Sequence, residues 1–589
     1  MKRSKGSNVQ LILIIILIMA FSAEAITDQP RLYFGHEEAE WVKNTMAKMT
    51  LEEKIGQMIT CRYSGYFVNL DSEYVREIET LIVERKIGGL SLFGGNVYET
   101  AYLTNAFQGM SNIPLLIASD FERGVANQIE GSTLFPSLMA IGAISSEETA
   151  YSMGRITALE SRAIGVHMTY APVVDVNINP ENPIINIRSF GENPEQVSRL
   201  AKAFIRGCQE NGLIATAKHF PGHGDTELDS HIELPIVKAD RKRLEAVELY
   251  PFKQVVESGV QAIMTTHIYF PHLDPTPNLP ATLSPQIITE LLRNEYGFKG
   301  LILTDAMDMG GVTNLYGPEG SALKAVQAGV DLVLIPLEIE KVIDTLIQAV
   351  SSGLISETRI DASVKRILEV KAMLGLHKNK LVEVDVLDRV IASNEHLQEA
   401  RGMFERSMTL VKNEEEILPL SDPLPKLAVF SLSSDPGEYF AGRVFISEIE
   451  EKYPEFMSFY ADCYTGEEYI REGLEKARET DLIIFALFSK RAAWKGSVDL
   501  EKKHIQIVQE TAKGSPPVIV VSFGSPYFIR HFPEVDAYLC AFQGSAQAQK
   551  TAVKALFGEI DIRGKLPVTL PGLFPLGHGL TLLKKTEDQ

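Results

Sequence analysis

Gly300-Leu-Ile-Leu-Thr-Asp305 is a short apolar run that ends in a carboxylate, and seven comparable runs lie elsewhere in the first 340 residues. The eight runs occupy residues 57–62, 89–93, 115–120, 167–176, 214–220, 262–268, 301–307 and 331–336. They are rich in β-branched residues and alternate with longer amphipathic stretches, which predicts parallel strands joined by crossover helices. Eight such repeats in roughly 300 residues predict an α/β fold of the (β/α)8 TIM-barrel type rather than an open sheet.

Polar side chains gather where these runs end. They are Asp120, Asp175, Lys218, His219, His267 and Asp305. The interior of a buried strand does not accommodate such groups without partners. A TIM barrel places its active site at the carboxyl ends of its strands, so we expect these side chains to lie around one site.

Four further apolar runs follow the barrel, at residues 427–432, 481–488, 517–524 and 537–542, again alternating with helical segments. They predict a smaller three-layer α/β/α sandwich domain. Between the two domains lies a segment with a predicted helix at 394–406 and a proline-rich stretch at 417–425. Because proline disfavours a central strand, we interpret the segment as a linker. The predicted barrel domain spans 26–380, the linker 381–425 and the second domain 426–589.

The first 25 residues match a secretory signal. Lys2, Arg3 and Lys5 precede an unbroken apolar run at 11–21, and Ala-Glu-Ala follows at 23–25. Eleven apolar residues span roughly 16 Å as a helix, too short for a hydrocarbon core of about 30 Å. We therefore expect cleavage before Ile26 and export to the periplasm or the exterior, without stable membrane insertion; an uncleaved anchor is the alternative.

Charge and cysteine content exclude several classes of protein. The chain of 589 residues has 57 Lys and Arg against 77 Asp and Glu, a formal net charge of -20. Such a charge argues against nucleic-acid binding through phosphate neutralisation and against adhesion to anionic membranes. The four cysteines are far apart, with no metal-binding spacing, so neither a disulfide framework nor a structural zinc site is expected.

The most informative stretch is Lys218-His-Phe-Pro-Gly-His-Gly-Asp-Thr-Glu-Leu-Asp-Ser-His231, which leaves a predicted strand and enters a loop. One interpretation is a metal site, with candidate ligands His219, His223, Asp225, Asp229 and His231. The other is an acid/base pair of Asp229 and His231, since side chains at i and i+2 of an extended loop lie on the same side. The carboxylate then orients one imidazole nitrogen and leaves the other to move protons. The motif favours the acid/base pair.

Asp305 closes an apolar strand, where its carboxylate points into the predicted barrel mouth. Its alternative role is to cap the next helix, a task that Asp308 or Thr304 can also perform. A carboxylate and a proton shuttle facing one pocket fit retaining glycoside hydrolysis. The acid would here be a histidine rather than the usual second carboxylate.

These residues resemble glycoside hydrolase family 3, in particular its β-N-acetylhexosaminidase branch of the two-domain type. The loop at 218–231 is similar to that branch's hallmark, and Ile302-Leu-Thr-Asp-Ala-Met307 resembles its nucleophile strand. Further similar segments lie at residues 41–58, 171–177, 188–192, 407–413 and 563–567.

The resemblance implies a cofactor-independent, metal-free glycosidase that releases terminal β-linked N-acetylglucosamine from peptidoglycan fragments or chitooligosaccharides. Asp305 matches the nucleophile, His231 the acid/base and Asp229 its partner. The positions that match hydrogen-bonding residues for the sugar hydroxyls are Asp120, Arg188, Lys218 and His219. A salt bridge at the barrel rim is the alternative for Arg188, and a structural network for Lys218 and His219.

The chain departs from the family pattern at one point. Gln128 stands where an arginine commonly contacts the sugar, and Arg123 lies nearby in sequence. Glutamine still forms hydrogen bonds but carries no charge, which bears on sugar preference more than on reaction class. The alternatives are a phosphorylase or β-glucosidase of the same family, a metal-dependent hydrolase, and a non-catalytic sugar-binding protein. In the second domain, residues 490–494 and Asp499 either contact an aglycone or face solvent, the latter being favoured.

Overall fold

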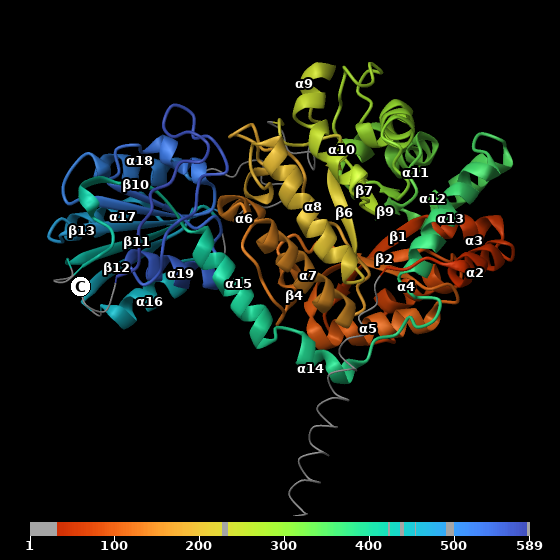
Figure 1. Cartoon of the computed structure of the whole chain (residues 1–589), viewed down its shortest axis with the longest axis horizontal. Helices are drawn as coiled ribbons and strands as arrows, with labels where there is room; N and C mark the ends of the chain where they lie inside the picture. The colour runs from red at the N-terminus through yellow and green to blue at the C-terminus, as the bar shows by residue number, and fades with distance from the viewer. Residues whose placement is uncertain are drawn as a thin grey trace, which may run out of the picture.

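The computed structural model describes residues 32–226, 234–421, 425–435, 441–453, 455–489 and 500–585. Figure 1 shows two bodies side by side, a large barrel from the first part of the chain and a smaller domain from the last part. Helix α15 (Asn394–Ser407) runs between them. The predicted signal segment lies outside the described residues.

Parallel strands form the barrel, in the ring order β1-β2-β3-β5-β6-β7-β8-β9. Their bounds are β1 Ile59–Gly65, β2 Gly89–Asn96, β3 Leu116–Ser119, β5 Met168–Thr169, β6 Ile214–Phe220, β7 Ala262–Thr265, β8 Leu301–Leu303 and β9 Val333–Leu334. β9 pairs with β1, and a bridge between Leu303 and Leu332 brings it beside β8. The sheet is thus nearly closed, which confirms the predicted barrel. A short strand that was not predicted, β4 (Ile129–Glu130), pairs with β2.

Amphipathic helices surround these strands. Helix α8 (Pro194–Glu210) illustrates why they form where they do: Asn193 accepts a hydrogen bond from the Gln196 backbone, and Pro194 occupies the first turn. A capping side chain and an N-terminal proline both favour a helix start. The other helices here are α2 His36–Met46, α3 Leu51–Gln57, α4 Glu73–Val83, α5 Val97–Met110, α6 Leu138–Ile144, α7 Glu147–Ala163, α9 Arg241–Ala246, α10 Leu249–Glu257, the π-helical Gln286–Glu295, α11 Gly310–Ala328, α12 Ile339–Ser351 and α13 Glu357–Met373.

The second domain holds a six-stranded sheet in the order β10-β15-β14-β13-β11-β12. The strands are β10 Thr409–Asn413, β11 Leu427–Ser433, β12 Phe456–Ala461, β13 Leu482–Phe488, β14 Val518–Phe523 and β15 Ala537–Cys540. β10 is antiparallel to β15 and the other pairs are parallel. The four predicted runs correspond to β11, β13, β14 and β15, whereas the edge strands β10 and β12 were not predicted.

Alternating side chains of this sheet pack into two separate hydrophobic cores. Ala428 and Phe430 of β11 pack in one cluster with α17 (Glu467–Ala477) and α18 (Lys502–Ala512). Val429 packs in the other with α16 (Arg443–Lys452) and α19 (Ala546–Leu556). Successive residues of a strand point to opposite faces, so both faces are covered by helices. The predicted three-layer α/β/α architecture is confirmed.

The boundary between linker and second domain differs from the prediction. Strand β10 lies within the segment 381–425, yet it is hydrogen-bonded to β15 as the edge of the second sheet. Of the rest of that segment, residues 387–390 form the short helix α14 (Leu387–Val390), and 394–407 form α15. The second sheet therefore starts before Lys426, inside the segment predicted as a linker.

The two domains share buried contacts. Met139, Ala140 and Ala143 of α6 belong to a core cluster of the second domain, although α6 is part of the barrel chain. Across the same junction, Thr569 donates two hydrogen bonds to the Glu192 carboxylate, at 2.8 and 2.5 Å. The junction is therefore a packed interface rather than a flexible hinge.

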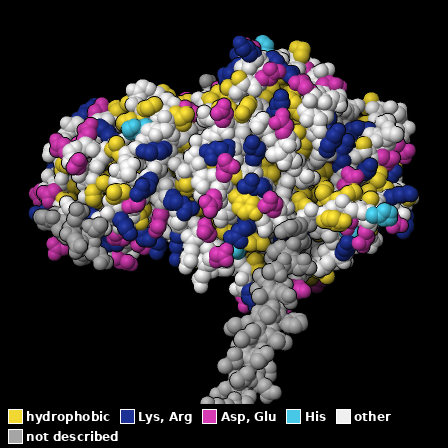
Figure 2. All heavy atoms as spheres, viewed as in Figure 1, with side chains coloured by type: hydrophobic (Ala, Val, Ile, Leu, Met, Phe, Trp, Pro, Cys, Tyr) yellow, Lys and Arg dark blue, Asp and Glu magenta, His cyan; other side chains and the backbone are white. Residues whose placement is uncertain are grey.

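The surface carries mixed charge. On the face seen in Figure 2, Lys and Arg side chains are interspersed with Asp and Glu, and hydrophobic side chains are scattered between them. No helix among the described residues has the length and apolarity needed to cross a membrane.

Candidate active site

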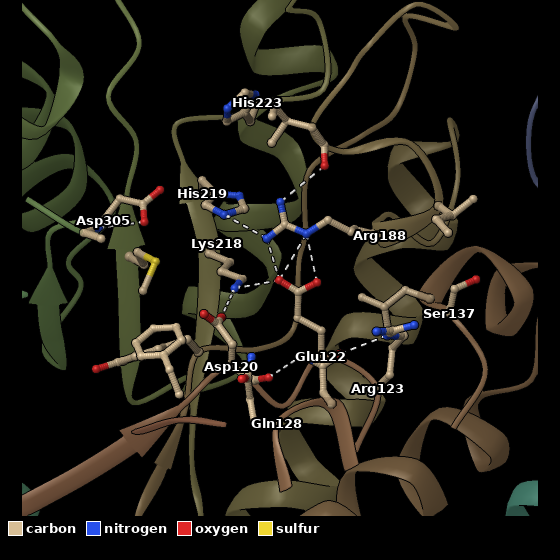
Figure 3. A pocket seen from close by; sticks show the side chains of 18 of the residues that line it. Asp120, Glu122, Arg123, Gln128, Ser137, Arg188, Lys218, His219, His223 and Asp305 are labelled. Atoms are coloured by element: carbon tan, nitrogen blue, oxygen red, sulfur yellow. Dashed lines mark hydrogen bonds and ion pairs between the residues drawn. The ribbon is translucent and has the colours of Figure 1, made fainter. Parts of the chain in front are cut away.

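A cavity of about 710 Å³ lies at the carboxyl ends of the barrel strands. Its lining includes all five described residues that the sequence assigned to the site, namely Asp120, Arg188, Lys218, His219 and Asp305. Figure 3 shows them around one space, with Asp305 on one side and the charged cluster facing it. The fold thus brings together residues that are up to 185 positions apart in the sequence (305 − 120 = 185).

Lys218 is the centre of the cluster. It lies in β6, only 3% of its side chain is exposed, and its Nζ is 2.5 Å from Asp120 Oδ1 and 2.7 Å from Glu122 Oε1. Burial by itself lowers the pKa of this ammonium group, but the carboxylates of Asp120 and Glu122 outweigh burial and raise the pKa above its ordinary value. Lys218 is therefore a fixed cation that organises two carboxylates at the cavity wall.

Arg188 is also held by a carboxylate, but it comes from another element. It ends the short 3-10 turn Asn186–Arg188, and its Nε and Nη2 donate to the Glu122 carboxylate at 2.8 and 2.5 Å. The Glu122 carboxylate and its neighbours outweigh the effect of burial and raise the arginine pKa. A two-pronged pair of this kind fixes the guanidinium plane. The salt bridge that was considered as an alternative for Arg188 is therefore present, and Arg188 also lines the cavity.

His219 is oriented by a buried carboxylate. Its Nδ1 donates to Asp175 Oδ2 at 2.7 Å, and Asp175 Oδ1 accepts the backbone N–H of His223 at 2.7 Å. Burial raises the pKa of Asp175, but the charge and hydrogen bond of His219 overcome it, and the pKa is lowered. Because Asp175 holds Nδ1–H, the other ring nitrogen of His219 faces Arg188, whose Nη2 is 3.5 Å away. In the neutral imidazole this hydrogen bond keeps the proton on Nδ1 and leaves Nε2 as an acceptor.

Asp305 follows β8 and takes no part in capping a helix. Its Oδ1 accepts the Ala306 backbone N–H at 2.8 Å, whereas α11 begins at Gly310 with Met309 in the cap position. The two other candidate caps are also engaged elsewhere: Asp308 pairs with Arg62, and Thr304 Oγ1 accepts the Leu334 N–H. The helix-cap alternative for Asp305 is therefore wrong.

His267 supports the backbone beside Asp305. It is fully buried, and its Nε2 donates to the Ala306 carbonyl oxygen at 3.1 Å. Ala306 is the residue whose N–H binds the Asp305 carboxylate. The polar residue that the sequence places at the end of β7 thus helps to position the carboxylate at the end of β8.

The predicted acid/base pair, Asp229 and His231, lies outside the described residues. The loop that leads to it starts at the cavity, because His223 lines the cavity wall and its Nδ1 is 3.0 Å from Thr226 Oγ1. Burial lowers the pKa of His223 to about 3, so this imidazole is neutral at ordinary pH. Asp225 pairs with Arg243 at 3.1 Å.

The metal alternative gains no support from the part of the chain that the structure describes. There, no group of three or more His, Cys, Asp or Glu side chains is arranged to hold a metal ion. Of the candidate ligands, His219 and Asp225 are held by Asp175 and Arg243, respectively. Activity measured with and without a chelator tests the metal interpretation directly.

Sequence reasoning missed two groups of cavity residues. Glu122 contacts both Arg188 and Lys218, yet it stands in the segment that departs from the family pattern and was not assigned a role. The second domain, in which only residues 490–494 and Asp499 were considered as possible contacts, contributes part of the wall through Phe488, Ser489, Phe523, Gln543, Gly544 and Ser545. These are ordinary apolar, amide and hydroxyl side chains, so no motif marks them. Residues 490–494 and Asp499 lie outside the described residues.

Gln128 and Arg123 both line the cavity. The Gln128 side chain accepts the backbone N–H of Gly94 at 3.1 Å, and Arg123 Nε donates to Asn127 Oδ1 at 2.9 Å. The structure thus places an arginine at the same cavity as the glutamine, although from a different position in the chain.

Comparison with known proteins identifies the family. Residues 50–370 match the glycosyl hydrolase family 3 N terminal domain, and residues 408–577 match the glycosyl hydrolase family 3 C-terminal domain. The chain is 30% identical over 558 residues to "Beta-hexosaminidase A" of Pseudoalteromonas piscicida, covering 84% of this chain and 91% of that protein. It is 26% identical to the "Beta-N-acetylglucosaminidase/beta-glucosidase" of Cellulomonas fimi, covering 90% and 95%.

Solved structures agree with the sequence matches. A glycoside hydrolase family 3 beta-N-acetylglucosaminidase from a Paenibacillus species superposes with a TM-score of 0.78 at 31% identity, covering 89% of this chain and 99% of that one. The beta-glucoside phosphorylase BglX superposes with a TM-score of 0.82 at 27% identity, covering 93% and 99%. Both domains are covered in each case. On its sequence, its two-domain fold and the site at its barrel mouth, the chain belongs to glycosyl hydrolase family 3 and is a glycosidase.

Proposed function

We propose that this protein is a retaining β-N-acetylglucosaminidase that releases terminal β-linked N-acetylglucosamine from peptidoglycan fragments or chitooligosaccharides. The observation that carries the proposal is that Asp305 lines the same cavity as the charged cluster around Lys218. The relatives named for hexosaminidase or N-acetylglucosaminidase activity, which match along most of both chains, support the choice of sugar.

In this proposal the charged cluster binds the terminal sugar. Asp120 and Lys218 form a carboxylate–ammonium pair. Arg188 and His219 lie against each other in the same cluster. Sugar hydroxyls both donate and accept, so they fit between fixed cations and carboxylates, and hydrogen bonds to charged groups are strong and directional. The hydroxyl pattern of the sugar is thereby oriented before any bond breaks.

Asp305 then attacks the anomeric carbon while His231, oriented by Asp229, donates a proton to the leaving oxygen. The bond between carbon and leaving oxygen breaks, and a glycosyl ester of Asp305 forms. His231, now without that proton, removes a proton from water, which attacks the same carbon and releases Asp305. Two displacements retain the anomeric configuration.

Phosphorolysis is the second candidate, and similarity to the beta-glucoside phosphorylase along nearly the whole of both chains favours considering it. A phosphate oxygen in place of water would attack the glycosyl ester, releasing Asp305 and a sugar 1-phosphate. Phosphate is repelled less by a neutral or cationic histidine than by a glutamate.

Hydrolysis of chromogenic β-N-acetylglucosaminide beside β-glucoside, with and without phosphate and a chelator, tests the proposal. We expect preference for the acetamido sugar, release of free sugar and no effect of the chelator. Preference for the glucoside would instead indicate a β-glucosidase, a sugar 1-phosphate product a phosphorylase, and a loss of activity with chelator a metal-dependent hydrolase. Absence of turnover on both sugars would contradict the proposal and favour a sugar-binding role.

Export is a further part of the proposal. Its support is the basic, apolar and small-residue pattern of residues 1–25. N-terminal sequencing of the protein from its native host should give a chain that starts at Ile26. A chain that keeps residues 1–25 would contradict cleavage.

A further inference from the structure

The cavity has an interdomain lobe, defined here by Arg123, Ser137, Phe488, Phe523, Gln543 and Ser545. In Figure 3, Arg123 and Ser137 lie across the space from Asp305, beyond the Glu122–Arg188 pair. The lobe is part of the same cavity as the sugar-binding cluster and Asp305. Its far wall belongs to the second domain.

Among the described residues that line the cavity, Arg123 is a cation without a carboxylate partner. Lys218 pairs with Asp120 and Glu122, and Arg188 pairs with Glu122. Within the described part of the chain, the only hydrogen bond of the Arg123 side chain goes from Nε to the neutral amide of Asn127, and no carboxylate oxygen lies within ion-pair distance. Its two terminal nitrogens, Nη1 and Nη2, have no protein partner there.

The surroundings do not offset this charge. Burial lowers the pKa of Arg123, and the attraction of Glu122 does not compensate, since Arg188 opposes it. A guanidinium stays protonated at any physiological pH. A largely buried cation without a partner is unfavourable by itself, and it becomes favourable when a ligand supplies the negative charge.

The rest of the lobe suits a polar ligand with an apolar face. The rings of Phe488 and Phe523 stack at 4.5 Å with an interplanar angle of 7°. Gln543 donates through Nε2 to the Phe135 carbonyl oxygen at 3.3 Å, while its Oε1 is buried without a partner among the described residues. The lobe therefore combines an acceptor that lacks a donor, hydroxyl groups and a free guanidinium face.

We propose that Arg123 binds an oxyanion in the interdomain lobe and thereby makes the enzyme select ligands that carry one. This inference rests on the proposed glycosidase function and names the substrate class as acidic glycans. The oxyanion comes either from a carboxylate on the glycan or from inorganic phosphate. A guanidinium matches both groups through two parallel N–H bonds.

A structural role for Arg123 has to be separated from ligand binding. Arg123 donates to Asn127, whose Nδ2 donates to the Asp120 carbonyl oxygen at 2.8 Å. Through this chain, the arginine also supports the backbone of a proposed sugar-binding residue. Asn127→Ala breaks the chain while keeping the charge of the guanidinium, so it reports on the support that the chain gives to the Asp120 backbone.

The test compares two disaccharides that differ by one carboxylate: N-acetylglucosamine β-1,4-linked to N-acetylglucosamine, and the same sugar linked to N-acetylmuramic acid. For the wild type, Arg123→Gln, Arg123→Lys and Asn127→Ala, kcat/KM is measured on both substrates, with and without phosphate. Arg206→Gln is the matched control, because it removes the same charge from an exposed barrel position.

If the oxyanion belongs to the glycan, Arg123→Gln lowers the acidic-to-neutral ratio of kcat/KM by about 10- to 100-fold. Arg123→Lys, which keeps the charge, retains part of the ratio, and Asn127→Ala and Arg206→Gln leave it unchanged. If the oxyanion is phosphate, phosphate alters turnover of the neutral disaccharide by the wild type, and Arg123→Gln abolishes that response.

The inference is overturned if Arg123→Gln changes neither the ratio nor the phosphate response, or if Asn127→Ala lowers the ratio equally. If the wild type hydrolyses neither disaccharide, the proposed function fails, and calorimetry decides the inference separately. N-acetylmuramic acid and phosphate are then titrated into wild type and Arg123→Gln. Loss of binding in the variant supports the oxyanion site, and equal or absent binding in both proteins excludes it.

Discussion

At the scale of single residues, Glu122 holds the site together. Its carboxylate is shared between Arg188 and Lys218, which come from different elements, and its side chain is only 12% exposed. A carboxylate buried between two cations is stabilised by both, and its removal leaves both cations short of negative charge. The orientation of two proposed sugar-binding groups therefore depends on a residue that the sequence motifs did not single out.

We expect Glu122→Gln to lower kcat/KM on β-N-acetylglucosaminide by about 10²- to 10³-fold, because Arg188 and Lys218 lose their common anchor. The same change should lower the free energy of unfolding by about 2–4 kcal/mol. Steady-state kinetics and denaturant unfolding measure the two effects. The control is Glu130→Gln, an exposed position that accepts a hydrogen bond from Tyr66; equal behaviour of both variants would refute the anchoring role.

His219 depends in the same way on Asp175. Asn at position 175 keeps the shape but no longer accepts the Nδ1 proton as a charged group, so the imidazole loses its fixed tautomer. We expect Asp175→Asn to lower kcat/KM by about 10- to 100-fold while the protein stays folded. Near-wild-type kinetics in a folded Asp175→Asn protein would show that the orientation of His219 is unimportant.

How far single residues were predictable depends on whether a motif marks them. Asp120, Lys218 and Asp305 end apolar runs, where a polar side chain stands out in the sequence. Glu122 lies two residues after Asp120, in a segment with no regular period. Its role follows from the position of Arg188, 66 residues further along the chain, which only the folded chain reveals.

At the scale of elements, α13 presents an unusual residue to the barrel. Lys371 is 0% exposed, and its Nζ donates to Gln57 Oε1 of α3 at 2.6 Å. Burial lowers the pKa of this amine to about 7, far below its ordinary value. No carboxylate among the described residues pairs with it, so the contact between α13 and α3 includes a polar group that is neutral above neutral pH.

This lysine predicts a pH dependence of stability. The unfolded chain binds a proton at Lys371 up to about pH 10.5, whereas the folded protein binds it only below about pH 7. The unfolded state therefore holds more protons between these values, and the contribution of Lys371 to stability increases as pH rises from 7 to 10. At pH 7 the penalty is on the order of 4 kcal/mol.

We expect Lys371→Met to be more stable than the wild type at pH 7 and to lose that advantage towards pH 10. Denaturant unfolding at several pH values measures the difference, with the exposed Lys365→Met on the same helix as control. Stability curves of Lys371→Met and wild type that run parallel over this range would show that the lysine stays charged in the folded protein.

Strands were predictable where they are buried on both faces. β11, β13 and β14 are buried at every position, so each reads as a continuous apolar run. The edge strand β12 is mostly half-buried, and β10 ends in Lys412 and Asn413. Without a continuous apolar run, neither edge strand stands out, and β10 was assigned to the linker.

At the scale of the whole molecule, α6 joins the two domains. Leu138 and Ile141 pack in the barrel core, whereas Met139 and Ala140 pack in the core of the second domain. The cavity lies at the same junction, since Ser137 and Leu138 line it. The helix that packs the two domains together thus also contributes to the wall of the cavity. No sequence pattern predicts this arrangement, because it depends on which helix faces meet.

We expect Met139→Asp to uncouple the domains, because it places an unpaired charge in a fully buried position. The loss should be about 3–5 kcal/mol at the interface. Differential scanning calorimetry should show a single transition in the wild type and two separated transitions in the variant. Leu354→Asp, at an exposed position of the barrel, serves as control. A single, unshifted transition in Met139→Asp would contradict a packed interface.

The central claim is that Asp305 is the nucleophile of a retaining glycosidase. A 5-fluoro-N-acetylglucosaminyl fluoride tests it directly, because the ring fluorine slows both displacements while the fluoride leaving group favours the first. We predict that the protein gains the mass of one fluorosugar, that the labelled peptide carries the sugar on Asp305, and that Asp305→Ala is neither labelled nor active. A label on another carboxylate, or full activity of Asp305→Ala, would contradict the claim.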